Sequence, residues 1–305
     1  MKPLIRSKNR DFYNSPGEFR AKYKGEEKTL FAGREESSKS ETDMKVGFYE
    51  KTGEGKYQYL NDDKRVPHLT LQDPAVVHIN TEYGNELVLA GVKVWPSHIN
   101  GKEELQYATV FYRDHGKGIE HLSEFLTGPS KMKDVRLAQS PDGKKITVFT
   151  RPQHSEESLG GRGKIGYFQV STLEDITADK MKNAPIFRHQ FADQEWGGVN
   201  AAEYIDDHRI GIIGHYARFD ANSNRDYIGV SWILDTRANV LSTPKVILER
   251  SDLPRGLMRG SKSKDLRNVL FPGGFVKNPD GTYSIFGGEG DMRTFLAIVP
   301  NPFKN

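Results

Sequence analysis

The sequence predicts an all-β fold, and three features of its 305 residues carry that prediction. Runs with apolar residues at helical spacing are scarce, whereas short β-branched or aromatic runs alternate with polar turns. A similar unit then recurs along the whole chain. No linker, low-complexity tract or change of composition marks a domain boundary, so we expect residues 1–305 to form a single domain.

Two tight turns mark the clearest hairpins. Residues 140–143 and 278–281 both place Pro before Asp-Gly, where proline presets its φ angle and glycine adopts the positive φ that a tight turn requires. Each turn leads into a run of β-branched and aromatic residues, at 144–150 and 282–286. Both runs are therefore predicted to be the second strands of β-hairpins.

Comparable second strands recur along the chain and determine the predicted architecture. Their starts are separated by 58, 58, 64 and 74 residues and lie near Lys28, Glu86, Lys144, His208 and Thr282. Five units of about 60 residues, each able to hold four short strands, predict a five-bladed β-propeller. The alternative is a β-sandwich with a helical appendage. Only residues 173–182 have a locally helical pattern, which we expect in a loop between blades.

Polar residues recur at one place in each predicted blade. In a propeller the first strand of each blade lines the central channel, and functional residues gather at one mouth of it. The predicted first strands begin at 13–14, 72–74, 133–134, 198–200 and 271–274, and the second strands end at 33–35, 91–93, 151–152, 214–216 and 287–291. Each residue alone has a structural explanation (His215, for example, as a core histidine). Because they occupy the same position in every repeat, however, we predict that they gather in one polar pocket at the channel mouth, called the basin below.

The basin combines carboxylates with cations. Its members are Asp73, Asp134, Glu35, Glu289 and Asp291 on the acidic side and Arg34, Lys93, Lys133, Arg151 and His215 on the basic side. One carboxylate could protonate a glycosidic oxygen, and an inverting hydrolase would need a second one as base, about 6.5–9.5 Å away. A phosphorylase instead needs one acid and several cations that hold phosphate. The abundance of cations favours an anionic second substrate.

Composition argues against several other classes of protein. The net charge of +3 is spread along the chain and gives no footprint for nucleic acid or a membrane surface, and the basic run at 262–267 is predicted to be a solvated loop. The sequence lacks an 18-residue apolar run, a signal-peptide pattern and cysteine, so we expect a cytoplasmic protein without disulfides. Histidine spacing indicates no metal site. The glycine-rich residues 160–164 lack the pattern of a nucleotide-binding loop, and we interpret them as a lid near the basin.

Several short motifs, taken together, resemble a known family. Residues 133–137 with 149–152, and residues 268–274 with 286–291, are similar to the third and last blades of the β-mannoside phosphorylases of glycoside hydrolase family 130. The resemblance extends to residues 12–14, 33–35 and 72–74 and so covers nearly the whole chain. The pattern is closer still to the related mannosyltransferase/phosphorylase group, glycosyltransferase family 108, whose members build and phosphorolyse β-1,2-linked mannan.

The resemblance implies a role for each matched residue. Asp73 is implied as the catalytic acid, and as the base in the synthetic direction, with the proton passing through a hydroxyl of the bound sugar. Gln72 and Ala75 stand where the family has the Glu and Arg of a Glu-Asp-Pro-Arg motif, so Lys93 is the candidate for the missing cation. Phosphate, or the phosphate end of a sugar-phosphate donor, would be held by Lys133, Arg151 and His215. The mannosyl unit would be held by Asn14, Arg34, Asp134, Tyr216, Glu289 and Asp291.

We therefore expect an inverting enzyme that transfers mannose between a β-1,2-mannoside and either phosphate or a nucleotide-sugar donor. Its partner would be a small-molecule or oligosaccharide substrate, with no cofactor, nucleic acid or membrane involved. Two alternatives stay open at this point. One is a plain inverting β-mannoside hydrolase with Asp73 as acid and Glu35 or Glu203 as base. The other is a non-catalytic sugar-binding propeller.

Overall fold

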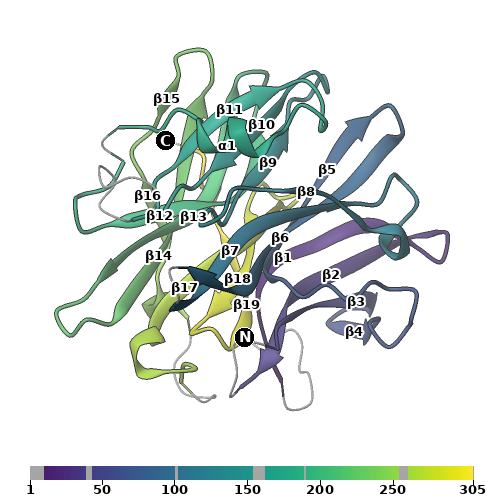
Figure 1. The fold of residues 1–305 in the computed structure, drawn as a ribbon, viewed down its shortest axis with the longest axis horizontal. Helices are drawn as coiled ribbons and strands as arrows, with labels where there is room; N and C mark the ends of the chain where they lie inside the picture. Colours follow the sequence, from purple (N-terminus) through teal and green to yellow (C-terminus); the bar gives the residue numbers. More distant parts are fainter. Residues whose placement is uncertain are drawn as a thin grey trace.

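The all-β prediction is confirmed. The computed structural model describes residues 10–38, 43–99, 102–153, 162–188, 190–253 and 260–304. In these ranges the regular structure is β-strand, apart from α1 (Ala178–Lys182) and a few single turns of 3-10 helix (Figure 1). The helix α1 lies inside the locally helical stretch that the sequence indicated, and the side chain of Thr177 caps it by accepting a hydrogen bond from the backbone N–H of Lys180.

The strands form successive antiparallel groups. The first group is β1 (Arg10–Tyr23), β2 (Glu26–Ser37), β3 (Lys45–Gly53) and β4 (Lys56–Tyr59), and the second is β5 (Gln72–Thr81), β6 (Gly84–Ile99), β7 (Lys102–Arg113) and β8 (Ser123–Thr127). The third is β9 (Arg136–Gln139), β10 (Ile146–Thr150) and β11 (Gly166–Val170). The fourth is β12 (Trp196–Tyr204), β13 (Arg209–Phe219), β14 (Arg225–Asp235), β15 (Val240–Leu241) and β16 (Lys245–Leu248), and the fifth is β17 (Asn268–Lys277), β18 (Tyr283–Glu289) and β19 (Arg293–Val299).

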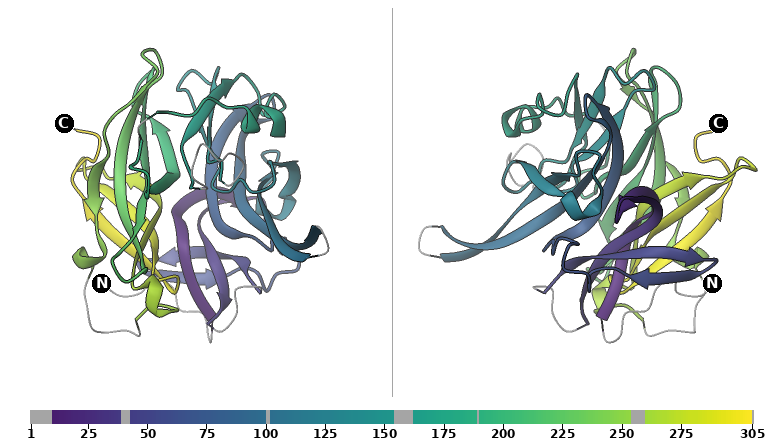
Figure 2. Two further views of the ribbon diagram at one scale, coloured as in Figure 1. Left: turned by 60° about the vertical axis from the view of Figure 1, so that its left-hand side comes forward. Right: turned by 90° about the vertical axis from the view of Figure 1, so that its right-hand side faces the viewer.

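Short parallel pairings join three of these groups. One residue pair links β1 to β19, and two link β14 to β17, so that the first, fourth and fifth groups form one continuous sheet. The second and third groups are separate sheets. The first strands of the groups contact one another in sequence, β1 with β5, β5 with β9, β9 with β12, β12 with β17 and β17 with β1. The second group and the fourth lie on opposite sides of the molecule (Figure 2).

Apolar side chains fill the spaces between neighbouring groups. The first and second groups enclose Leu30, Phe48 and Leu89, and similar clusters separate the second from the third, the third from the fourth and the fourth from the fifth. A further cluster around Phe12 and Phe286 packs the fifth group against the first. Each large apolar side chain buried in this way contributes about 1.5–3 kcal/mol, so this packing holds the first strands in fixed positions around the centre.

No helix within the described ranges is long and apolar enough to cross a membrane.

Candidate active site

Backbone irregularities mark polar residues on, or just before, the first strands of the groups. The pairing of β1 with β2 shifts around Asn14, that of β5 with β6 around Asp73, and that of β12 with β13 around Asn200. Asn14, Asp73 and Asp134 have φ angles of 50°, 48° and 59°, a left-handed conformation that Asn and Asp adopt more readily than other non-glycine residues. Bulges re-aim side chains, and such strain gathers at functional sites. These residues therefore point out of the regular ladder, towards a common site.

Asp73 is held through one of its two oxygens. Asn14 Nδ2 donates a hydrogen bond to Asp73 Oδ1 at 2.7 Å, and Arg34 Nη1 lies 3.6 Å from the same atom. The Asp73 side chain is 12% exposed. Oδ2 makes no hydrogen bond with the part of the chain that the structure describes, so it is the oxygen that can release or accept a proton.

A buried network fixes Arg34 beside Asp73. Arg34 donates from Nε and Nη2 to Glu36 Oε2 at 2.9 and 2.7 Å, and Glu36 Oε1 accepts from the Tyr13 hydroxyl and from Lys262 Nζ. Burial disfavours the charged guanidinium, but the attraction of Asp73, Tyr13 and Glu36 outweighs burial and raises the pKa of Arg34. Arg34 therefore stays a cation next to the carboxylate.

The run 262–267 is not wholly a solvated loop, as the sequence had suggested. The side chain of Lys262 is only 8% exposed, because it enters this network and binds the fully buried Glu36. The run supplies one cation to the site, although nothing in its local sequence distinguishes Lys262 from a surface lysine.

A second cluster surrounds Asp134. Arg151 Nη1 donates to Asp134 Oδ2 at 2.8 Å, and Arg136 Nη2 reaches Oδ1 at 3.5 Å. Burial alone would raise the pKa of Asp134, but the charges of Arg151, Arg136 and Lys133 outweigh it and lower this pKa to about 2. Arg151 Nε also donates to the carbonyl of Gly197 at 2.7 Å. Asp134 thus orients Arg151 and stays ionised.

His215 lies in the same cluster and is neutral. Its Nδ1 is 2.8 Å from Asn200 Oδ1, and its ring stacks on Tyr227 with centroids 5.3 Å apart and lies against Phe271. Burial and the neighbouring charge of Arg151 hold the pKa of His215 well below its usual value. Lys133, which acts electrostatically on Asp134 and His215, forms no hydrogen bond or ion pair with any residue described.

Two glycines allow the close packing around Arg151. A Cβ atom on Gly198 would lie 2.5 Å from Arg151 Cδ and 3.2 Å from His215 Cε1. A Cβ atom on Gly163 would lie 2.7 Å from Arg151 Nε. The run 160–164 therefore borders the basin at Gly163, whereas Gly160 and Gly161 lie outside the described residues.

The two clusters belong to one site. Arg136 is buried between them: it bonds to Asp134 and donates to the carbonyl of Asn200, and the charges of both Asp134 and Asp73 act on it. The charge of Asp291 acts on Arg34 and Tyr13, which associates Asp291 with the Asp73 cluster. Five further residues complete the site: Tyr13 and Asn200, which stood among the predicted first-strand starts without an assigned role, and Glu36, Arg136 and Lys262, to which the sequence reasoning gave no place in the basin.

Three predicted site residues are not joined to these clusters by any contact within the described ranges. Lys93 is exposed on β6. Tyr216 follows His215 on β13 and so points to the opposite face, where its hydroxyl donates to Glu195, and burial and that bond raise its pKa to about 12. Glu289 is held by Arg293 at 3.0 Å and by Arg250 at 3.2 Å.

Neither candidate for a hydrolytic base is brought to Asp73. Glu35 points to the face of β2 opposite Arg34 and is buried against Arg10 Nε at 3.0 Å and Lys45 Nζ at 3.5 Å. Glu203 is exposed on β12, where it lines a cavity of about 190 Å³ together with Arg136 and Asn200. Within the described ranges, no three His, Asp or Glu side chains are grouped to hold a metal ion.

The chain matches one family model and several solved structures. The family described as "Protein of unknown function (DUF1861)" matches residues 6–305. MPT-4, a mannose phosphorylase from Leishmania mexicana solved with phosphate ion, is 28% identical with a TM-score of 0.78, over 97% of this chain and 85% of that one. MPT-1, a GDP-Man-dependent mannosyltransferase from Leishmania mexicana, is 26% identical with a TM-score of 0.78, over 97% of this chain and 87% of that one.

A structure from the GH130 family of mannoside phosphorylases is 11% identical with a TM-score of 0.50, over 94% of this chain and 84% of that one, a likeness that concerns the fold alone. No curated protein matches the sequence.

Proposed function

The chain belongs to the DUF1861 family, and from that premise we propose that it is a glycosidase-like phosphorylase or mannosyltransferase. It transfers mannose, with inversion at the anomeric carbon, between a β-1,2-mannoside and either phosphate or a nucleotide-sugar donor. One observation carries the proposal. Asp73, whose Oδ2 forms no hydrogen bond with the described residues, shares a site with the cationic cluster of Arg151 and Lys133, while Glu36 and Asp134 are both occupied by buried cations.

The chemistry follows from this arrangement. In phosphorolysis Asp73 supplies a proton to the glycosidic oxygen, through a sugar hydroxyl, as the bond from that oxygen to the anomeric carbon breaks. An oxygen of phosphate forms the new bond to the same carbon from the opposite face, which inverts its configuration. In the synthetic direction the carboxylate of Asp73 takes the proton from the acceptor hydroxyl. The leaving group is then phosphate, or the nucleotide of the donor.

Two cations whose charges act on both Asp134 and His215 support the phosphate subsite. Arg151 is oriented by Asp134 and by the Gly197 carbonyl, and Lys133 has an uncommitted ammonium group within the described structure. Such charge-assisted donors bind phosphate oxygens strongly and stabilise the charge that develops in the transition state. The same donors could hold the phosphate end of a nucleotide sugar.

The arrangement of the sheets supports the finer proposal that the fold is a five-bladed propeller. The five first strands contact one another in a ring, and an apolar cluster lies between every pair of neighbouring groups, including the fifth and first. This arrangement would bring Asn14, Asp73, Asp134 and Asn200 to one mouth of a central channel.

Incubation with β-1,2-mannobiose, with and without phosphate, tests the proposed function. We expect α-mannose 1-phosphate to form only when phosphate is present, and mannosyl transfer from GDP-mannose to a mannoside acceptor if the nucleotide sugar is the donor. Release of free mannose at the same rate without phosphate would establish the hydrolase instead. Binding of mannosides with no turnover in any of these assays would establish a sugar-binding module.

We expect Gly198→Ala to weaken phosphate binding. The new Cβ atom would lie 2.5 Å from Arg151 Cδ, so the guanidinium must move from its position beside His215. Losing one charge-assisted hydrogen bond corresponds to about a tenfold rise in the phosphate Kd, measured by calorimetry. Gly53→Ala is the control, because its Cβ atom would come no closer than 3.6 Å to Lys56 in the β3–β4 hairpin. An unchanged Kd in Gly198→Ala would place phosphate elsewhere.

A further inference from the structure

We infer that the anion subsite selects a tetrahedral anion that carries a hydroxyl group, such as hydrogenphosphate, over one without it, such as sulfate, because His215 presents a hydrogen-bond acceptor among the cations. The inference rests on the proposed function, since it concerns the same subsite. It assigns a role to Asn200, which fixes the orientation and the protonated nitrogen of the His215 ring. Asn200 is therefore a positioning residue.

The orientation of Asn200 determines which nitrogen of His215 carries the proton. Asn200 Nδ2 donates to the backbone carbonyl of Pro272, an atom that can only accept. Asn200 Oδ1 must then face His215, 2.8 Å from its Nδ1, and it too can only accept. Nδ1 therefore carries the hydrogen, and in a neutral imidazole the other nitrogen, Nε2, is left as an acceptor.

The surroundings of His215 keep its ring neutral. The charged groups that act on it are Arg151, Lys133 and Arg136, which oppose a positive charge, and Asp134, which favours one but is paired with the arginines. The remaining neighbours are the stacked ring of Tyr227 and that of Phe271. Protonating Nε2 would add a further buried positive charge to this cluster.

The acceptor atom is not used by the protein. His215 is buried, with 1% of its surface exposed, and its Nε2 makes no hydrogen bond with the described residues, yet this atom is not among the side-chain atoms that are sealed from solvent without a partner. A Cβ atom on Gly198 would lie 2.5 Å from Arg151 Cδ and 3.2 Å from His215 Cε1, the ring carbon between the two nitrogens, so the Arg151 side chain and this edge of the imidazole are neighbours. The inference places an anion that Arg151 binds beside that edge, within reach of Nε2.

The charge of the cluster suits a dianion and does not by itself distinguish phosphate from sulfate. Arg136, Arg151 and Lys133 carry three positive charges and Asp134 one negative charge, which leaves two. Hydrogenphosphate and sulfate are both tetrahedral dianions. Only hydrogenphosphate has a P–OH group that can donate to Nε2, whereas sulfate would set an oxygen lone pair against the nitrogen lone pair. A site built to receive a donor rejects an analogue that lacks one.

Binding of inorganic phosphate and of sulfate to the full-length protein at about pH 8 tests the inference. We expect calorimetry to show phosphate binding at least about tenfold more tightly than sulfate, the equivalent of one hydrogen bond. In His215→Gln, a side-chain amide can turn its N–H group to the ligand, and the ratio should fall towards one. Asn200→Asp places a carboxylate against Nδ1 and favours the doubly protonated ring, so sulfate should bind more tightly than to the wild type.

A third measurement uses only the wild-type protein, so it does not require that any variant folds. Sulfate binding to the wild-type protein should strengthen as the pH falls, since protonation turns Nε2 into a donor. Equal affinity for the two anions at pH 8, with phosphorolysis intact, would overturn the inference and leave the proposed function standing. Failure to bind either anion, together with no phosphate-dependent turnover, would overturn the proposed function and the inference with it.

Discussion

Asp73→Asn is expected to lower phosphorolysis of β-1,2-mannobiose by about 10²–10⁴-fold, the usual contribution of a general acid. Asparagine keeps the shape of the side chain and adopts the left-handed backbone of this position, where φ is 48°. Its carbonyl oxygen can still accept the hydrogen bond from Asn14 Nδ2. The substitution therefore keeps the shape and the bond from Asn14, and removes the exchangeable proton together with the negative charge beside Arg34. Steady-state kinetics with varied phosphate would measure the loss in kcat.

The leaving group distinguishes an acid from a structural residue. A mannoside with an activated aryl leaving group needs no protonation, so the loss in Asp73→Asn should be much smaller with that substrate. The Kd for phosphate should change little, because the anion subsite is built around Asp134 and Arg151. Asp142→Asn, in the exposed turn before β10, is the control and should keep full activity. Undiminished turnover in Asp73→Asn would show that another group supplies the proton.

The sequence predicted the residues whose position repeats from one unit to the next. Asn14 and Asp73 lie at bulges of the first strands, and Asp134 just precedes the third one, at the positions that the repeat in the sequence indicated. Arg151 and His215 follow from the ends of the second strands by the same argument. A repeat in the chain becomes a cluster in space only because the first strands contact one another in a ring.

Local sequence could not tell which residues of each strand point into the site and which point to the opposite face. Within β13, alternation directs His215 into the site and Tyr216 away from it, and near the end of β2 it separates Arg34 from Glu35. A shift of one residue in either register would exchange those roles, and the register depends on bulges that the residue types do not reveal. Lys262 could not be predicted because it is brought to Glu36 by a connection between distant strands.

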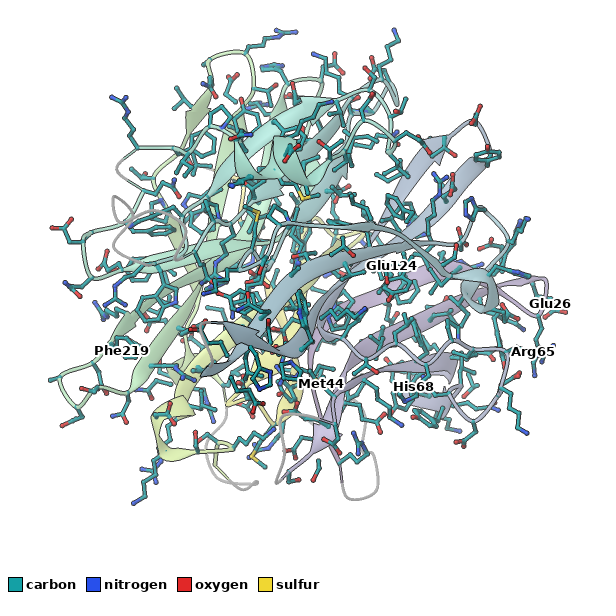
Figure 3. All side chains as sticks on the ribbon, in the orientation of Figure 1. Glu26, Met44, Arg65, His68, Glu124 and Phe219 are labelled. Carbon is teal, nitrogen blue, oxygen red and sulfur yellow. The ribbon has the colours of Figure 1, made fainter. Side chains whose placement is uncertain are left out.

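Asp134→Asn is expected to destabilise the protein by about 3–5 kcal/mol. Removing one partner of a buried ion pair leaves an uncompensated charge, and here both Arg151 and Arg136 lose their carboxylate. The backbone contributes little, since asparagine tolerates the φ of 59° at this position. Urea unfolding at pH 7 measures the difference. Glu26→Gln, which breaks an exposed pair with Lys28 at the edge of the molecule (Figure 3), should leave stability unchanged.

The stabilisation that Asp134 provides should weaken as the pH falls. The folded-state pKa of Asp134, about 2, lies below its ordinary value of 3.8, so its contribution to stability is complete above about pH 4 and is lost as the pH falls towards 2. The difference in unfolding free energy between wild type and Asp134→Asn should be constant from pH 7 to about 4 and narrow below that. A difference that stays constant down to pH 2 would show that the carboxylate is not held ionised by the arginines.

A double variant separates the contribution of the Asp134–Arg151 ion pair to stability from its contribution to phosphate binding. Buried ion pairs are often replaced by neutral groups without loss of stability, so the pair is poorly explained by folding alone. Asp134→Asn combined with Arg151→Gln removes both charges, and we expect the double variant to recover part of the stability lost in Asp134→Asn. Its phosphate Kd should nevertheless stay well above that of the control variant Glu26→Gln. Recovery of phosphate binding along with stability would mean that Arg151 is a structural residue and that the anion is held elsewhere.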